Sequence, residues 1–204
     1  MNLLALGAHP DDIEFGCAGT LIKYAQKGEN IYLVVLTKGE LGGDPKVRRQ
    51  EQIKSQRIIG AQKLYWGGYE DTKIPLDKSL VQWIEDIIKE VKPDFIFVNY
   101  PEDTHQDHHR LASASISATR YTRNVLFYEV PTTANFNPNV FVDIKSVFHH
   151  KINTLEAHRS QLLKTNIEDL SIVDIAKATA HFRGTQARVK FAEGFVSLRL
   201  FINI

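Results

Sequence analysis

Short runs of apolar residues, separated by longer segments with helical periodicity, recur along the first two thirds of the chain. Strands that lack polar alternation are typical of a sheet that is covered on both faces. Helices between successive strands connect them in parallel, because a parallel pair needs a long crossover. The sequence therefore predicts an α/β, doubly wound, Rossmann-like fold with a mostly parallel sheet and helices on both faces. The strands expected here are 3–6, 31–36, 63–66, 95–98 and 125–128.

The segments between these strands have the spacing of amphipathic helices. The clearest is 78–91, where apolar residues recur on one helical face. The other helices in this part are expected at 20–26, 45–59 and 106–122. In the last third we expect a strand at 140–144 and helices at 146–163 and 171–182. Every second residue from Val196 to Ile204 is aliphatic, which predicts a final strand, and no linker divides the chain, so we expect one domain over residues 1–204.

The balance of charges argues against several classes of protein. The chain holds 25 Lys and Arg against 24 Asp and Glu, so its formal net charge is +1. This balance argues against a nucleic acid bound through bulk charge and against a polybasic membrane anchor. Cys17 is the only cysteine, which excludes a disulfide and a cysteine-based zinc site within the chain. No apolar run approaches the roughly 20 residues of a membrane span, and a signal peptide is not recognised, so we expect a cytoplasmic protein without membrane partners.

The loop after the first strand carries acids and a histidine where a dinucleotide-binding fold would have glycines. Residues 7–14 read Gly-Ala-His-Pro-Asp-Asp-Ile-Glu, without the G-x-G-x-x-G pattern or a phosphate-binding lysine motif. Ligands in doubly wound folds bind beyond the carboxyl ends of the strands, which is where this loop lies. Acidic groups at this position would repel a pyrophosphate, so a nucleotide cofactor is not expected.

The loop after the fourth strand is also rich in histidine and acid. Three histidines and three acids fall within residues 102–109. A solvated helix start is one explanation, because acids are favoured near a helix N-terminus. A metal site is the other, because two such loops at adjacent strand ends can supply two imidazoles and a carboxylate to one ion. Two histidines, one carboxylate and an open position suit catalytic zinc and also non-haem iron, so the ligand types leave the metal undecided.

The two loops also match motifs. Residues 8–14 correspond to A-H-P-D-D-E with Ile13 inserted before Glu14, and residues 105–108, His-Gln-Asp-His, correspond to H-x-D-H without a gap. This pair resembles the LmbE-like (PIG-L) N-acetylglucosaminyl deacetylases. Weaker likenesses to the same family extend over nearly the whole chain, at 39–43, Arg48 with Glu51, 158–161 and 192–195. Within the family, the short single-domain chain resembles the enzymes that act on small glucosaminides, such as the bacillithiol-pathway deacetylases.

The resemblance implies a role for each residue of the motifs. Asp11 would be the general base, a choice over Asp12 that spacing alone leaves open. His105 would stabilise the oxyanion or protonate the departing amine, and Asp107 would hold an imidazole in orientation. The residues expected to bind Zn²⁺, with Fe²⁺ as the alternative ion, are His9, Asp12 and His108.

Three further residues are expected to bind the sugar: Glu40, Arg48 and Asp71. A surface ion pair between Arg48 and Glu51 is the alternative for Arg48, and a turn position is the alternative for Asp71. The function expected is zinc-dependent removal of the N-acetyl group from a small N-acetylglucosaminide by a homo-oligomeric enzyme. A non-catalytic sugar- or metal-binding module is the alternative, although a pure binder has no need for a second acid beside the ligand. Phosphoester hydrolysis ranks third, because it usually needs two metals.

Overall fold

The computed structural model describes residues 1–202, and its strands form one seven-stranded sheet with the order β3-β2-β1-β4-β5-β7-β6. The strands β1 to β5 are all parallel, whereas β7 pairs antiparallel with both β5 and β6. The strands are β1 (Asn2–Gly7), β2 (Asn30–Thr37), β3 (Lys63–Tyr69), β4 (Phe95–Asn99), β5 (Val125–Tyr128), β6 (Val140–Asp143) and β7 (Ala192–Arg199). The doubly wound, mostly parallel sheet that the apolar runs predict is confirmed.

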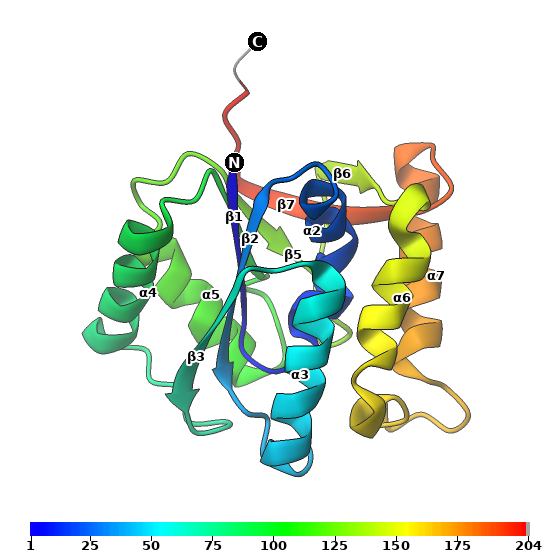
Figure 1. The fold of residues 1–204 in the computed structure, drawn as a ribbon, viewed down its shortest axis with the longest axis horizontal. Helices are drawn as coiled ribbons and strands as arrows, with labels where there is room; N and C mark the ends of the chain where they lie inside the picture. Colours follow the sequence, from blue (N-terminus) through cyan, green and yellow to red (C-terminus); the bar gives the residue numbers. More distant parts are fainter. Residues whose placement is uncertain (203–204) are drawn as a thin grey trace.

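Helices cover both faces of this sheet (Figure 1). On one face lie α4 (Lys78–Val91) and α5 (Gln106–Ala118), and the other face carries α2 (Ala18–Ala25), α3 (Pro45–Ile59), α6 (Phe148–Glu156) and α7 (Ile172–Ala187). The short elements are α1 (Asp12–Gly16) and the 3-10 helices η1 (Lys145–Val147) and η2 (Arg159–Gln161). Each face has its own cluster of buried apolar side chains, so the sheet separates two cores.

Capping residues fix where the helices begin. Asp44 accepts hydrogen bonds from the backbone N–H groups of Lys46 and Val47, and Pro45 occupies the first turn of α3. At the other end Gly60 adopts a φ of 80°, a left-handed conformation that glycine reaches without strain. Asp77 caps α4 in the same way as Asp44 caps α3. These caps fix the residues at which α3 and α4 begin, and so also the ends of the loops that precede these two helices.

The end of the chain differs from the expected pattern. The last strand begins at Ala192 and ends at Arg199, although the aliphatic alternation continues beyond it. Arg199 pairs with Val125, the first residue of β5, so the next residues have no strand to pair with at that edge. The expected helix over 146–163 is also broken, because the α-helix ends at Glu156 and η2 follows. Asn203 and Ile204 lie outside the described residues.

None of the helices in residues 1–202 has the length and apolar character needed to span a membrane.

Candidate active site

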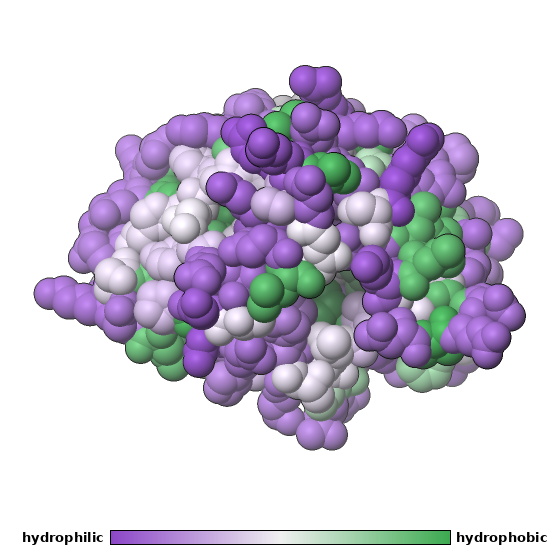
Figure 2. Space-filling view, turned by 90° about the horizontal axis from the view of Figure 1, so that it is seen from below, coloured by the Kyte–Doolittle hydropathy of each residue, from purple (hydrophilic) through white to green (hydrophobic). Residues whose placement is uncertain are grey.

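The carboxyl ends of all five parallel strands meet at one edge of the sheet, and each is followed by a polar loop that reaches the same cleft. The cleft has a volume of about 920 Å³. Viewed from this edge, the protein surface has a hollow near its centre, with hydrophobic residues beside it (Figure 2). Since β1 leads to α1 and β4 to α5 on opposite faces, the cleft lies at the switch point where such folds bind ligands.

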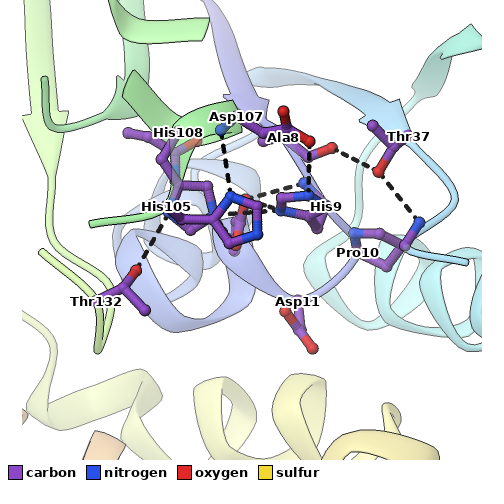
Figure 3. Close-up of polar contacts among 12 residues, drawn as sticks. Ala8, His9, Pro10, Asp11, Thr37, His105, Asp107, His108 and Thr132 are labelled. Atoms are coloured by element: carbon purple, nitrogen blue, oxygen red, sulfur yellow. Dashed lines mark hydrogen bonds and ion pairs between the residues drawn. The ribbon is translucent and has the colours of Figure 1, made fainter. Parts of the chain in front are cut away.

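Three side chains that could bind a metal converge in the cleft between β1 and β4. The Nδ1 atom of His9 lies 3.2 Å from Nε2 of His108. One oxygen of the Asp12 carboxylate lies 3.3 Å from His108 Nε2, and the other lies 3.7 Å from His9 Nδ1. All three side chains are buried. Figure 3 shows the two imidazoles turned toward each other, His9 from the loop after β1 and His108 from the first turn of α5.

The outer nitrogen of His9 faces carboxylates. Its Nε2 atom lies 3.0 Å from Asp71 and 3.2 Å from Asp107. A carboxylate accepts a proton in a hydrogen bond and cannot donate one when ionised, so Nε2 must carry the hydrogen. The inner nitrogen, Nδ1, then presents a lone pair to His108 and Asp12. This arrangement, a carboxylate behind an imidazole, is the one that orients histidine ligands in metal sites.

His108 is held in the same manner from the other side. Its Nδ1 atom lies 3.2 Å from Asp103 and 3.3 Å from the hydroxyl of Thr132, which leaves the lone pair on Nε2 facing the cluster. The two lone pairs and the carboxylate of Asp12 therefore face one another with no proton assigned between them. Ligands bound to one tetrahedral Zn²⁺ at about 2.0–2.1 Å lie roughly 3.4 Å apart, close to the separations found here.

The residues present thus fit a divalent cation. A third nitrogen is near, because ligand atoms of His9, His105 and His108 lie within 4.8 Å of one another. A second group with this spacing consists of His9, Asp71 and Asp107. That group uses the outer face of His9, where the carboxylates are needed as hydrogen-bond acceptors. The inner face of His9 is therefore the one that fits a cation, and its ligand types suit zinc or ferrous iron.

The charges around the cluster favour a positive ion. Burial by itself lowers the pKa of His9, but the surrounding carboxylates outweigh it and raise that pKa well above its usual value. Burial also opposes charge on His108, yet Asp12 and Asp103 raise its pKa to about 9. Burial would raise the pKa of Asp12, but the two imidazoles hold it well below its usual value. Without a metal, the carboxylates favour protonation of the two imidazoles. A bound cation would balance the same negative charge.

Asp11 is the carboxylate that the cluster does not use. It adopts a left-handed backbone conformation with φ of 88°, so its side chain leaves the loop in a different direction from that of Asp12. In Figure 3 it points away from the imidazoles, and its carboxylate lies 3.4 Å from Arg48. Burial raises its pKa to about 6, although Arg48 and His158 oppose this shift. The geometry therefore separates the two adjacent acids: Asp12 forms, with His9 and His108, the group that we call the donor cluster, whereas the carboxylate of Asp11 lies outside it.

His105 occupies the N-cap of α5 and faces the same space. Its Nδ1 atom accepts a hydrogen bond from the backbone N–H of Asp107 at 3.2 Å. A neutral ring must then carry its proton on Nε2. Burial, followed by the charges of His9 and His108, lowers the pKa of His105, which favours the neutral form. The ring stacks on His108 with centroids 4.7 Å apart, so its free N–H is held in a fixed direction.

Arg48 reaches the cleft from the first turn of α3. Its guanidinium donates to the carbonyls of Gly39 and Pro10, each at 2.8 Å. Gly39 has a φ of 62°, and a Cβ there would collide with this guanidinium. The ion pair between Arg48 and Glu51 that we considered does not form, because Glu51 accepts hydrogen bonds from Ser160 instead. Arg48 therefore lines the cleft and ties the loops after β1 and β2 together.

The other two expected sugar contacts, Glu40 and Asp71, lie in the loops that follow β2 and β3. Asp71 is buried; one of its oxygens faces His9 and the other accepts the backbone N–H of Leu41 at 3.1 Å. Glu40 accepts the backbone N–H of Asp71 at 2.9 Å, and its second oxygen is buried without a partner. Asp71 therefore supports His9 directly, a contact that the sequence pattern did not indicate.

Several residues that shape the site lie outside the motifs. Asp103 and Thr132 were missed, although Asp103 belongs to the acidic loop after β4 and Thr132 follows β5 at the same sheet edge. The rule that ligands bind beyond strand ends would have pointed to both loops. His158 and Glu14 form a buried pair behind Asp11, with 3.6 Å between His158 Nε2 and the carboxylate. The motif residue Glu14 also accepts hydrogen bonds from two side chains of α3, so it serves packing rather than the cleft.

Comparison with known proteins identifies the family. The model of a family described as PIG-L, GlcNAc-PI de-N-acetylase, matches residues 4–119, more than half of the chain. The chain belongs to the PIG-L family. The matched stretch contains every residue of the donor cluster, the acids behind it, Asp11 and Arg48. The residues between 129 and 179 that complete the cleft lie beyond the matched stretch.

Similar proteins come from several bacteria and an archaeon. The uncharacterized deacetylase YaiS of Escherichia coli is 36% identical over 168 residues, covering 78% of this chain and 91% of its own. A probable N-acetyl-α-D-glucosaminyl L-malate deacetylase 2 of Bacillus anthracis is 27% identical and covers 82% and 87% of the two chains. The solved structure of N,N'-diacetylchitobiose deacetylase from Pyrococcus horikoshii superposes with a TM-score of 0.85 at 25% identity, covering 97% of this chain and 83% of its own.

Proposed function

We propose that this PIG-L protein is a metal-dependent N-deacetylase that removes acetate from a small N-acetylglucosamine-containing molecule. The observation that carries the proposal is the convergence of His9, Asp12 and His108, with the carboxylate of Asp11, which pairs with Arg48, lining the same cleft. The proposal agrees with the names of the relatives, one acting on a glucosaminyl malate and another on diacetylchitobiose. Zn²⁺ is the ion we propose first, with Fe²⁺ as the alternative that the same donors accept.

His9, Asp12 and His108 would hold the ion. When bound, Zn²⁺ lowers the pKa of water to about 7 and polarises a carbonyl, which supplies the Lewis acidity that amide hydrolysis needs. The carboxylate of Asp11 accepts a proton from the attacking water, whose oxygen forms the new bond to the acetyl carbon. Asp11 then returns this proton to the sugar nitrogen as the C–N bond breaks, giving acetate and the free amine.

His105 completes the environment of the reacting carbonyl. Because Nδ1 accepts a backbone hydrogen bond, the Nε2–H group is free to donate to the oxygen on which negative charge develops. Asp71, Asp107 and Asp103 act through the imidazoles that they contact. They fix which nitrogen of each ring carries the hydrogen and which faces the cleft.

Arg48 and Glu40 are our proposed contacts to the sugar hydroxyls. Arg48 presents donors that its two carbonyl partners leave free, and its buried Nε atom has no partner within the protein. Glu40 has one oxygen without a hydrogen-bond partner among the described residues; this oxygen is buried next to the cleft, whose lining includes the following residues Leu41 and Gly42 but not Glu40 itself. Both oxygens of Asp71 already accept hydrogen bonds, so we propose that it orients His9 and touches the sugar only through its remaining lone pairs.

The test is acetate release from a panel of N-acetylglucosaminides, with metal analysis of the same sample. We expect acetate and free amine in equal amounts from the wild-type protein, and loss of both metal and activity in His108→Ala. His109→Ala is the matched control, since His109 is exposed and its Nδ1 contacts the carbonyl of Pro101 rather than the cluster. Full metal occupancy in His108→Ala would move the ligand elsewhere. Metal and sugar binding without any acetate release would favour the non-catalytic binding module.

A further inference from the structure

The three residues of the donor cluster sit on three separate segments of backbone. His9 lies in the loop after β1, Asp12 begins α1, and His108 lies in the first turn of α5, which follows β4. The register between β1 and β4 ends at the pair Leu6 and Val98, before either strand reaches its ligand. The hydrogen bonds of the sheet therefore do not by themselves fix how far apart the three segments lie.

One side chain, that of Tyr128 at the end of β5, contacts all three segments. Its hydroxyl donates to the carbonyl oxygen of Leu6 at 2.7 Å and lies 3.1 Å from Oδ1 of Asn99, the last residue of β4. Because β4 lies between β5 and β1 in the sheet, the side chain reaches across one strand to the other. Its ring packs on Gly16, the last residue of α1, where a Cβ would collide with it.

The polar pair of Tyr128 and Asn99 is not what packing alone would place here. Both side chains are 0% exposed, and neither lines the cleft, so neither touches a substrate there. The Nδ2 atom of Asn99 has no hydrogen-bond partner within residues 1–202, and a buried polar group without a partner is unfavourable. Phenylalanine and leucine would fill the same space without that cost. What the polar pair adds is a link between the ends of β1 and β4.

We propose that Tyr128 is a positioning residue that sets the separation of His9, Asp12 and His108, and through it the affinity and geometry of the metal site. The inference rests on the proposed function, which assigns these three residues to one ion. A site whose ligands are already held close to their bonding positions binds a metal more tightly than one that must first be drawn together. Without the hydroxyl, the ends of β1 and β4 are free to move apart, and the ion has to oppose that movement.

The experiment compares Zn²⁺ affinity and the Co²⁺ absorption spectrum of wild type and Tyr128→Phe, which keeps the ring and removes the hydroxyl. Partners that contact a ligand directly contribute about 10- to 100-fold to metal affinity, and Tyr128 acts through the backbone, so we expect a loss of about 10-fold. The cobalt spectrum should change as well, because it reports coordination geometry. Asn99→Leu breaks the same link from the other side and should show a similar loss. The double variant should lose no more than either single one, because one link is removed in all three.

Thr119→Val is the matched control for the general effect of losing a buried hydroxyl. Thr119 lies at the end of α5 opposite to His108, and its hydroxyl donates to the carbonyl of Ser115 at 2.7 Å. Both Thr119→Val and Tyr128→Phe should lower the melting temperature of the metal-free protein by roughly 2–12 °C. Only Tyr128→Phe should change the zinc affinity and the cobalt spectrum, which a purely structural role would leave as they are.

Wild-type zinc affinity and an unchanged cobalt spectrum in Tyr128→Phe would overturn the inference and leave the deacetylase intact. Equal losses of zinc affinity in Tyr128→Phe and Thr119→Val would overturn it too, as would losses that add up in the double variant. If Tyr128→Phe does not fold, Asn99→Leu decides, and wild-type zinc affinity in that variant would reject the link. A wild-type protein that binds neither Zn²⁺ nor Co²⁺ would remove the proposed function itself.

Discussion

Asp103→Asn removes one negative charge from behind His108 and leaves the shape of the side chain unchanged. One oxygen of Asp103 accepts the N–H of His105 at 2.8 Å and lies 3.2 Å from His108 Nδ1, while the other accepts the hydroxyl of Thr133 at 2.9 Å. An amide with its oxygen in the first position keeps both of those contacts, and the hydroxyl of Thr133 can turn to accept. Burial favours a neutral Asp103, but His108 holds its pKa below the usual value, so the wild-type group is ionised. The substitution therefore tests the charge alone.

Loss of such a partner typically weakens metal binding about 10- to 100-fold, which corresponds to roughly 1.4–2.7 kcal/mol. We expect this loss in a competition titration against a chromophoric chelator. At saturating metal, kcat should return to within a few-fold of wild type, because His9, Asp12 and His108 all remain.

Glu102→Gln is the control for the general effect of charge. Glu102 is exposed and accepts a hydrogen bond from Asn135 at 3.0 Å, so it makes the same change in net charge without touching His108. Its metal affinity should stay within twofold of wild type. Unchanged affinity in Asp103→Asn, or equal losses in both variants, would refute the role given to Asp103.

Three further substitutions separate chemistry, substrate binding and stability. Asp11→Asn should keep its metal and melting temperature but lose about 100- to 10,000-fold in kcat, as expected for a general base; near-normal turnover would exclude that role. Arg48→Ala should raise KM for an N-acetylglucosaminide roughly 10-fold with a smaller change in kcat, since a hydrogen bond to a charged group contributes about 1.5–3 kcal/mol. A fall in kcat as large as that of Asp11→Asn would instead mean that Arg48 acts by positioning Asp11. Lys151→Met should lower the free energy of unfolding by about 3–5 kcal/mol, because it leaves the buried carboxylate of Glu193 without its cation; urea denaturation with an unchanged midpoint would contradict this.

The central sheet was predictable because its strands are buried on both faces and so consist of uninterrupted apolar residues. The end of β7 was not, because alternation describes a residue's environment and says nothing about the length of the partner strand. The five-residue helix α1 was missed for a different reason. Its residues, which include Asp12 and Glu14, are chosen for the contacts they make rather than for helical periodicity.

The donor cluster was accessible from sequence because its members lie in two short motifs at strand ends. The acids behind the imidazoles were harder to assign, since Asp71 meets His9 across 62 residues of sequence and only the parallel register of β1, β2 and β3 brings them together. Asp103 was hidden among several acids in one loop. The hydrogen bonds that Asp103 accepts from the N–H of His105 and from the hydroxyl of Thr133 hold its carboxylate next to His108. The composition of the loop carries no information about these contacts.

The central claim is that one metal ion, held by His9, Asp12 and His108, makes this PIG-L protein a deacetylase. The most direct measurement is a titration of metal-free protein with Zn²⁺, or with Fe²⁺ under anaerobic conditions, following acetate release from an N-acetylglucosaminide. The account predicts no release without metal and a linear rise that stops at about one ion per chain, as a three-ligand open site requires. Acetate release by the metal-free protein, a rise that continues to two ions, or no release at full occupancy would contradict it.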